Sequence, residues 1–322
     1  MPIVARYKRK AIYPIKSYNY FMQKPPITSV TVGDYIHWGA DHFEEAGLFF
    51  GHGSDNPWDE SLSLVLFVLS LPWDSDSKVL DRQLSEKEKI QISDLFDRRI
   101  NEQIPAAYLT GEAWFAGFKF LVDSRVLVPR SPIAELIEAG FSPWLPDEPN
   151  NILDLCTGSG CIGIACAHYF PESNVTLSDI STDALTVAVQ NIVMHELSDR
   201  VVTAQSDLFG KLGKKTYDLI VSNPPYVDAE DLASMPKEYH HEPEIGLASG
   251  FDGLDFTRRL LRESVEHLSD NGVLIVEVGN SWESLEQAFP TVPFMWLEFE
   301  RGGHGVFLLT AEELQAHSQE FV

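Results

Sequence analysis

The chain has 322 residues, a net charge of −24 and a hydrophobic content of 44%. This length suggests two domains, and the hydrophobic content is sufficient for a packed core. The strong negative charge argues against nonspecific binding to nucleic acid or to an anionic membrane surface. The longest apolar stretch, residues 62–71, is interrupted by two serines and is too short to span a bilayer. We therefore expect no membrane association and no direct nucleic-acid partner.

Residues 1–33 differ from the rest of the chain because they carry basic residues and no acidic ones. This segment lacks the apolar core of a secretory signal, although its basic character is similar to that of a transit peptide. Met22 also offers an alternative start. We interpret residues 1–33 as a disordered or artefactual extension, whose basic residues are Arg6, Lys8, Arg9, Lys10, Lys16 and Lys24.

The three cysteines lie within eleven residues, at positions 156, 161 and 166. Their odd number excludes a complete disulfide framework, and their even spacing is not a zinc-binding pattern. We interpret them as small buried residues of a cytoplasmic protein.

Residues 34–107 show helical patterns. One amphipathic pattern begins at Asp34, and a more apolar one covers residues 58–69. Ser85 and Glu88 have the spacing of a capping box, which predicts a helix beginning there and ending before Pro105. This region is expected to form a small helical domain.

Residues 108–132 change to a strand-like pattern. We predict a β-hairpin with strands at 114–120 and 125–128, separated by a turn at Asp123-Ser124. The segment Pro129-Arg130-Ser131-Pro132 follows, and a helix is expected from Ile133. We place the joint between two domains here, so that residues 133–322 form the second domain.

The rest of the chain alternates between strands and helices, which indicates an α/β fold with a mostly parallel sheet covered on both faces. The connection at residues 301–304 is short enough to force antiparallel pairing of the last two strands. We therefore expect a Rossmann-like sheet of seven strands whose last strand is reversed. We predict strands at 152–156, 174–179, 200–205, 217–222, 272–278, 294–299 and 305–310, and helices at 160–170, 182–193, 255–268 and 281–288.

The tetrapeptide Asn223-Pro224-Pro225-Tyr226 directly follows the predicted strand 217–222. Two prolines cannot continue a strand, because neither has an N–H for the ladder. The Asn223 side-chain carbonyl and the Pro224 backbone carbonyl then form a pair of acceptors, suited to a planar –NH₂ group at the ligand-binding edge of a sheet. A rigid turn is the alternative interpretation of the same four residues.

A glycine-rich turn joins the strand at 152–156 to the next helix. Gly158 and Gly160 allow a ligand to approach the backbone, and the helix N-terminus presents N–H groups. Together with Gly163 they also match the G-x-G-x-x-G pattern of nicotinamide-binding proteins. Asp179 ends the following strand, where a carboxylate can accept hydrogen bonds from ribose hydroxyls. These features leave both cofactor types open.

Two further acids favour a cationic ligand. Asp154 lies inside the first strand, where it can bind an ammonium group or order the glycine turn, and a pyrophosphate would gain nothing from it. Asp207 ends the third strand and can approach an adenine amino group. Such a ring of acids suits S-adenosyl-L-methionine, which carries a sulfonium and an ammonium. Capping of loops is the alternative role for both residues.

The combination of these motifs resembles the class I S-adenosylmethionine-dependent methyltransferases, and more narrowly the protein-glutamine N5-methyltransferases. The resemblance covers the chain from about residue 30 to its end. It implies a helical domain that recognises a protein, a hairpin linker and a catalytic domain. It also implies cofactor-binding roles for Asp154, Thr157, Gly158, Gly160, Asp179, Asp207 and Asn223. Cys156 departs from the pattern, because many methyltransferases have glycine there, although a small side chain still leaves room.

The family has two main bacterial branches. The branch that modifies peptide-chain release factors usually has Pro-Arg-x-Asp-Thr-Glu where this chain has Pro-Arg-Ser-Pro at residues 129–132. The branch that modifies large-subunit ribosomal protein L-three resembles this chain there and in two further segments, 51–58 and 301–305. We therefore predict ribosomal protein L-three, a basic protein, as the substrate, with a release factor as the alternative.

The resemblance and the residue chemistry together suggest a mechanism. Asn223 and Pro224 would accept the two hydrogens of the glutamine amide, while Tyr226 packs on its plane. Pro225 and Glu242 are expected to border the substrate. His240, His241 and Glu242 could suggest a metal site, but further ligands are missing, and we predict a solvated loop and no metal.

Three other functions share parts of this pattern. A nicotinamide-dependent oxidoreductase would use the same glycine turn but gives Asn223 no role. A noncatalytic ribosome-assembly factor would not need the intact residues Asn223, Pro224, Tyr226 and Asp179. DNA adenine methyltransferases share Asn-Pro-Pro-Tyr, but the acidity of this chain speaks against DNA.

Overall fold

The computed structural model describes residues 30–321. Residues 1–29 of the predicted extension lie outside the described residues. The first helix, α1, already begins at Val32, two residues before the predicted start, because Thr31 and Asp34 form a capping box. The described chain divides into two compact units: residues 30–111 with 236–241, and residues 112–235 with 242–321.

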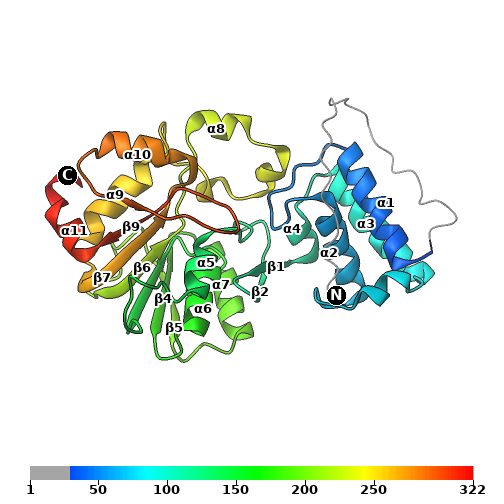
Figure 1. Cartoon of the computed structure of the whole chain (residues 1–322), viewed down its shortest axis with the longest axis horizontal. Helices are drawn as coiled ribbons and strands as arrows, with labels where there is room; N and C mark the ends of the chain where they lie inside the picture. The colour runs from blue at the N-terminus through cyan, green and yellow to red at the C-terminus, as the bar shows by residue number, and fades with distance from the viewer. Residues whose placement is uncertain (1–29, 322) are drawn as a thin grey trace. The chain divides into compact units, whose positions relative to one another are not determined.

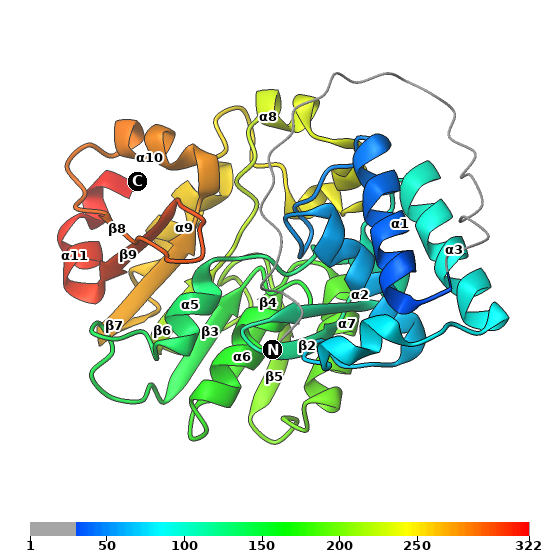
Figure 2. The same ribbon diagram turned by 45° about the vertical axis from the view of Figure 1, so that its right-hand side comes forward.

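The first unit is helical (Figure 2), and it has its own hydrophobic core. The predicted capping box is confirmed, since the Ser85 hydroxyl accepts from the Glu88 N–H and the Glu88 carboxylate accepts from the Ser85 N–H. This unit contains α1 (Val32–Glu45), α2 (Pro57–Leu69), η2 (Ser77–Asp81), α3 (Glu86–Asn101), α4 (Ala106–Thr110) and η3 (Lys237–His241).

The second unit begins with a β-hairpin of β1 (Glu112–Phe115) and β2 (Phe118–Leu121). The predicted position of this hairpin was wrong. Its turn is Ala116-Gly117, where both residues have positive φ, 47° and 82°, as a two-residue hairpin turn requires. At the predicted turn, the Asp123 carboxylate instead accepts from the Arg125 N–H, and residues 125–128 form no strand.

Among the described residues 112–321, the rest of this unit contains a seven-stranded sheet in the order β5-β4-β3-β6-β7-β9-β8. Most of these strands are labelled in Figure 1, and β3 and β8 are labelled in Figure 2. The strands from β5 to β7 are parallel, and β9 pairs antiparallel with both β7 and β8. The predicted reversal of the last strand is therefore confirmed. The strands are β3 (Asn151–Leu155), β4 (Asn174–Asp179), β5 (Val201–Gln205), β6 (Tyr217–Ser222), β7 (Leu268–Glu277), β8 (Met295–Trp296) and β9 (Val306–Thr310).

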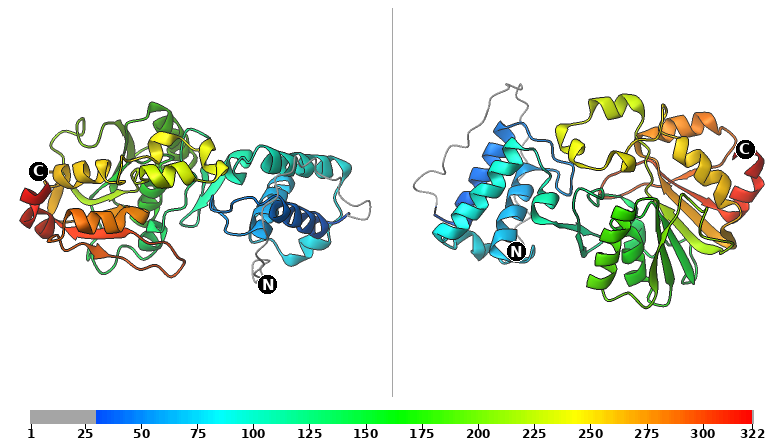
Figure 3. Two further views of the ribbon diagram at one scale, coloured as in Figure 1. Left: turned by 90° about the horizontal axis from the view of Figure 1, so that it is seen from above. Right: turned by 180° about the vertical axis from the view of Figure 1, so that it is seen from behind.

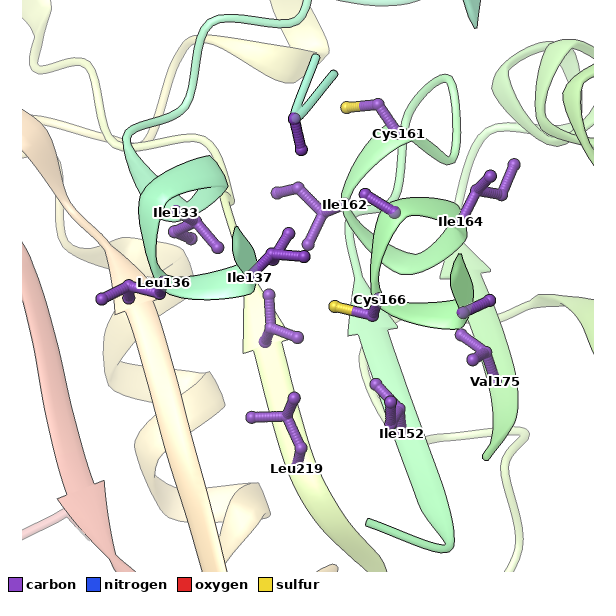
Figure 4. Packing of buried hydrophobic residues seen from close by; sticks show 14 of the residues in the cluster. Ile133, Leu136, Ile137, Ile152, Cys161, Ile162, Ile164, Cys166, Val175 and Leu219 are labelled. Atoms are coloured by element: carbon purple, nitrogen blue, oxygen red, sulfur yellow. The ribbon is translucent and has the colours of Figure 1, made fainter. Parts of the chain in front are cut away.

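Helices cover both faces of the sheet (Figure 3). Alternate strand residues belong to two separate cores: Ile152 and Leu219 to one, and Leu153 and Ile220 to the other, as the period-two geometry of a strand requires. Figure 4 shows α5 and α6 packed over β3, β4 and β6 in the first core. The helices are α5 (Ile133–Glu138), α6 (Cys161–Tyr169), α7 (Thr182–Met194), α8 (Ala229–Ser234), α9 (Asp255–Ser264), α10 (Trp282–Ala288) and α11 (Ala311–Ala316), with short turns η4 (Glu244–Gly246), η5 (Gly279–Ser281) and η6 (Ser318–Phe321).

Candidate active site

The carboxyl ends of β3, β4 and β6 meet where the strand order reverses. The chain builds the sheet outward from β3 to β4 and β5, and then returns to place β6 on the other side of β3. Ligands of open α/β sheets bind at such a point. Leu155 pairs with Ser178 in β4 and with Ser222 in β6. The next residue of each strand, Cys156, Asp179 or Asn223, therefore lies at the same level, which brings the predicted residues together.

The glycine turn after β3 is folded tightly by its own backbone. The Thr157 N–H donates to Ser178 O over 3.1 Å, and the Gly160 N–H donates to Thr157 O over 2.8 Å. Gly158 has φ of +55°, and a Cβ added there would meet no atom within 4 Å. Its outer side is thus open to a ligand. Cys156 also has positive φ, 58°, which explains in physical terms why glycine suits this position.

Asp154 is buried below the glycine turn. Its Oδ2 accepts from the Thr157 hydroxyl over 2.5 Å and from the Gly163 N–H over 2.9 Å. Its Oδ1 is also buried and has no hydrogen-bond partner among residues 30–321. Burial raises the pKa of this carboxyl to about 7, against the lowering effect of the two donors. Asp154 therefore orders the turn with one oxygen and leaves an acceptor for a ligand with the other.

Asp179 lies at the end of β4, beside the turn. Its Oδ2 accepts from the Gly158 N–H over 3.0 Å, and its Oδ1 accepts from the Ser181 N–H over 2.9 Å. Burial raises the pKa of this carboxyl, and the backbone donors oppose the shift. Each carboxylate oxygen has a further lone pair, so the geometry leaves Asp179 able to accept from a pair of ribose hydroxyls.

Asn223 directly follows β6 at the same edge of the sheet. Asn223 Oδ1 is buried without a hydrogen-bond partner among the described residues. The preceding residue, Ser222, is fixed because its hydroxyl donates to Leu155 O over 2.7 Å. Pro224 is buried, and Pro225 and Tyr226 are half-buried. An unpaired acceptor at a fixed strand end is what binding of an amino group requires.

The Tyr226 side chain is hydrogen-bonded to Glu277, a residue for which the sequence predicts no definite role. Its hydroxyl donates to Glu277 Oε1 at the end of β7 over 2.8 Å, and Ser131 donates to the other oxygen of Glu277 over 2.6 Å. The sequence offers only one signal for this contact, namely that Glu277 ends a strand next to β6.

Asp207 and Glu242 make ion pairs within the second unit. Asp207 Oδ1 lies 3.0 Å from Arg259 Nη2, and its contact with adenine stays a prediction. Glu242 accepts from Arg130 with both oxygens, over 2.6 and 2.7 Å, and from the Val128 N–H. This carboxylate holds its loop to the segment before α5, and its contact with substrate also stays a prediction.

No group of three or more potential metal ligands occurs in the part of the chain from residue 30 to 321. The two predicted loop histidines lie at the end of η3, and His241 Nε2 lies 2.9 Å from Glu102 O. None of the helices in the described region is long and apolar enough to cross a membrane.

Comparison with known proteins identifies the family. The methyltransferase small domain family matches residues 141–237. A ribosomal protein uL3 glutamine methyltransferase from Francisella tularensis is 50% identical and covers 90% of this chain and 93% of its own length. A protein of the same name from Xanthomonas campestris is 51% identical, with 89% and 94% covered. The chain belongs to the family of these two glutamine methyltransferases.

Among solved structures, the human methyltransferase 10 domain containing protein matches this methyltransferase with a TM-score of 0.44 and 15% identity. The match covers 61% of this chain and 89% of the human one.

S-adenosylmethionine is the methyl donor of this methyltransferase. The residues at the edge of the sheet described above fit this cofactor. The buried, unpaired Asp154 Oδ1 matches an ammonium, and Asp179 matches a ribose. The open side of Gly158 admits a ligand without a steric conflict.

Proposed function

We propose that this methyltransferase transfers a methyl group to the side-chain N5 of a glutamine in ribosomal protein uL3, called L-three above. The observation that carries the proposal is the buried, unpaired Asn223 Oδ1. Asn223 lies where the strand order reverses, at the same sheet edge as Asp154 and Asp179, the residues that would bind the methyl donor S-adenosylmethionine. An acceptor without a partner there complements a primary amide, which offers two N–H groups in one plane.

The chemistry requires activation of a poor nucleophile, because the amide lone pair is delocalised into the carbonyl. When bound, S-adenosylmethionine would supply an electrophilic methyl group, and its sulfur would leave as the neutral thioether of S-adenosylhomocysteine. Asn223 Oδ1 and the Pro224 carbonyl accept the two amide hydrogens and turn the nitrogen lone pair toward that methyl. Both hydrogen bonds strengthen as the nitrogen becomes tetrahedral and positive, so they stabilise the transition state more than the ground state.

The neighbouring residues keep this arrangement rigid and dry. Pro225 fixes the backbone that follows the acceptor pair, and the Tyr226 ring packs on the amide plane and excludes water. The product amide is positively charged on nitrogen and would lose its proton readily to water once it leaves the site, so no strong base is needed. Alignment of the two reactants is then the main contribution to rate.

The choice of uL3 rests on family and charge. Both relatives described above are named for that substrate. The net charge of −24 favours association with a basic protein, and the helical first unit would recognise it. The reaction would take place in the cytoplasm, where the ribosomal protein is made.

The proposal is tested by transfer of a labelled methyl group to two purified proteins, uL3 and a release factor. We expect label on uL3, located by mass mapping on one glutamine side chain. Label on the release factor alone would assign the chain to the other branch. Label on neither would disprove glutamine methylation of these two proteins.

Asn223→Ala tests the acceptor itself. We expect kcat to fall by about 100-fold or more, while the dissociation constant for S-adenosylmethionine stays within a few-fold of wild type. Asn223→Asp should retain part of the activity, because a carboxylate also accepts hydrogen bonds. Asn101→Ala, at an exposed position of α3, is the matched control. Wild-type turnover in Asn223→Ala would eliminate the acceptor role.

A further inference from the structure

Glu277 is a buried carboxylate that the methyl-transfer mechanism above does not use. It is the last residue of β7. Val276 pairs with Ser222, so Glu277 lies next to Asn223 at the same edge of the sheet. It is only 6% exposed, and burial raises its pKa, opposed by its hydroxyl partners. Burying a carboxylate is unfavourable unless its oxygens are paired, so the identity of its two partners indicates what it does.

Both oxygens of Glu277 accept hydrogen bonds from hydroxyl groups. Tyr226 donates to Oε1 over 2.8 Å, and Ser131 donates to Oε2 over 2.6 Å. Ser131 Oγ also accepts from the Ile133 N–H over 3.2 Å, at the start of α5. Glu277 thus joins the substrate-facing tetrapeptide to the Pro-Arg-Ser-Pro segment.

The residues after Glu277 hold the remaining parts of Tyr226. Ser281 Oγ donates to the Tyr226 carbonyl over 2.7 Å. A Cβ added at Gly279 would lie 2.5 Å from Tyr226 Cε2, and Gly279 has φ of +46°. One short segment, residues 277–281, therefore fixes the hydroxyl, the ring and the backbone of a single tyrosine.

We propose that Glu277 is a positioning residue, which holds the Tyr226 ring in the orientation that stacks on the substrate amide. This inference rests on the proposed function. If the ring contributed only apolar surface, a phenylalanine would serve, and no buried carboxylate would be needed for its hydroxyl. Misplacement of a substrate-orienting group by about 1 Å can lower turnover by about 100-fold, which gives the fixed ring a value for catalysis.

The test compares Tyr226→Phe, Glu277→Gln and the double variant with wild type. Each single change should lower kcat by between about 10- and 100-fold. The dissociation constant for S-adenosylmethionine and the KM for uL3 should change by less than about threefold. The double variant should be no slower than Tyr226→Phe, because that change already removes the contact that Glu277→Gln weakens. Losses that multiply in the double variant, or wild-type kcat in Tyr226→Phe, would overturn the inference.

Two further variants separate positioning from general support. Glu277→Ala should be slower than Glu277→Gln, since the glutamine carbonyl can still accept from Tyr226. Ser131→Ala removes the other hydrogen bond of Glu277 and should keep kcat within about twofold of wild type, although it lowers stability measurably. An equal loss of kcat in Ser131→Ala and Glu277→Ala would overturn the inference, because the carboxylate would then act through the Pro-Arg-Ser-Pro segment.

The same variants distinguish this inference from the proposed function. Coupling between positions 226 and 277 is also measured by urea unfolding, which requires no substrate. Absence of methyl transfer by the wild-type protein, with this coupling present, would reject the proposed function alone. Normal transfer by wild type, with no coupling in either kcat or unfolding, would reject the inference alone.

Discussion

Two of the buried oxygen atoms that lack a hydrogen-bond partner among the described residues are Asp154 Oδ1 and Asn223 Oδ1; the others are hydroxyls of Ser178, Thr257 and Ser264. Buried polar atoms in folded proteins are nearly always paired, and an unpaired one is destabilising by about 1–3 kcal/mol. Asp154 Oδ1 and Asn223 Oδ1 are acceptors near the carboxyl ends of the neighbouring strands β3 and β6. These two unpaired acceptors are unfavourable in the folded protein, and a ligand with N–H groups can satisfy them. S-adenosylmethionine and the substrate amide would be recognised in this way.

The sequence predicted which acids and amides converge but not how they are paired. Asp154, Asp179 and Asn223 could be located because strand ends in a parallel sheet meet at one edge. The bond between Tyr226 and Glu277 joins residues that are 51 positions apart. It depends on the register of β6 against β7, and no local pattern encodes that register.

Asp154 should make stability depend on pH. Its pKa of about 7 in the folded protein lies above the ordinary value of 3.8. Between about pH 4 and 7 the folded protein holds a proton that the unfolded chain has released, so this group's contribution to stability falls as pH rises and is constant above that range. Asp154→Asn has no such proton. The free energy of unfolding of Asp154→Asn minus that of wild type should therefore increase by a few kcal/mol between about pH 4 and pH 8.

Urea unfolding at several pH values, without the methyl donor, measures this difference. Only the change with pH in the difference between wild type and variant matters, because the substituted amide alters the local hydrogen bonds at every pH. Val189→Ala, at an exposed position of α7, changes no titratable group; it is the control and should show a constant difference. Parallel curves for Asp154→Asn and wild type would mean that Asp154 is ionised throughout the range.

Most elements of the sheet were predictable because they carry a strong periodic signal, although the strand predicted at 294–299 is only Met295–Trp296. Buried strands alternate with helices that begin and end at recognisable residues, and the predicted strands at 174–179 and 217–222 match β4 and β6. The hairpin was not predictable in the same way. Asp-Ser is a common turn sequence, whereas Ala116 adopts positive φ, a conformation that alanine rarely takes.

The contact of α6 with the sheet depends on one glycine. A Cβ at Gly163 would lie 2.2 Å from Leu177 Cδ2 in β4 and 3.0 Å from Asp154 Cβ in β3. Gly163→Ala should therefore push α6 away from both strands and destabilise the protein by about 1–3 kcal/mol. It should also weaken binding of S-adenosylmethionine, because the Gly163 N–H orders Asp154. Urea unfolding and calorimetry measure the two effects.

Leu177→Val provides the test of this steric cause. The shorter side chain removes the atom that the new Cβ would meet, so Gly163→Ala combined with Leu177→Val should be more stable than the sum of the two single effects predicts. Strictly additive effects would show that Gly163 is needed for a reason other than its contact with Leu177.

At the scale of the whole chain, a short segment leaves the catalytic unit and belongs to the helical one. Residues 236–241 lie in sequence between β6 and β7 but form part of the first unit. There Glu238 Oε1 accepts from Arg99 Nη1 over 3.2 Å and from the Phe49 N–H over 2.9 Å. Arg99 also donates to Glu60 over 2.5 Å. All three charged side chains are at most 2% exposed.

This arrangement was not predictable from sequence. Arg99 and Glu238 are 139 positions apart, and a division of the chain by composition treats each domain as continuous. The segment at residues 51–58 contributes as well, since Ser54 donates to the second oxygen of Glu60 over 2.8 Å. Residues 51–58 thus help to build the buried cluster to which Glu238 belongs.

Arg99→Ala should be strongly destabilising, because it leaves Glu60 and Glu238 buried together without a cation. The expected loss is about 3–5 kcal/mol in the free energy of unfolding, measured with urea. Trypsin should also cleave after Lys237 faster than in wild type, because the segment is no longer held. Arg98→Ala is the matched control: Arg98 is 42% exposed, and removal of such a surface charge should change stability by less than about 1 kcal/mol. If the two variants unfold alike and Lys237 stays protected in both, the buried cluster does not hold the returning segment.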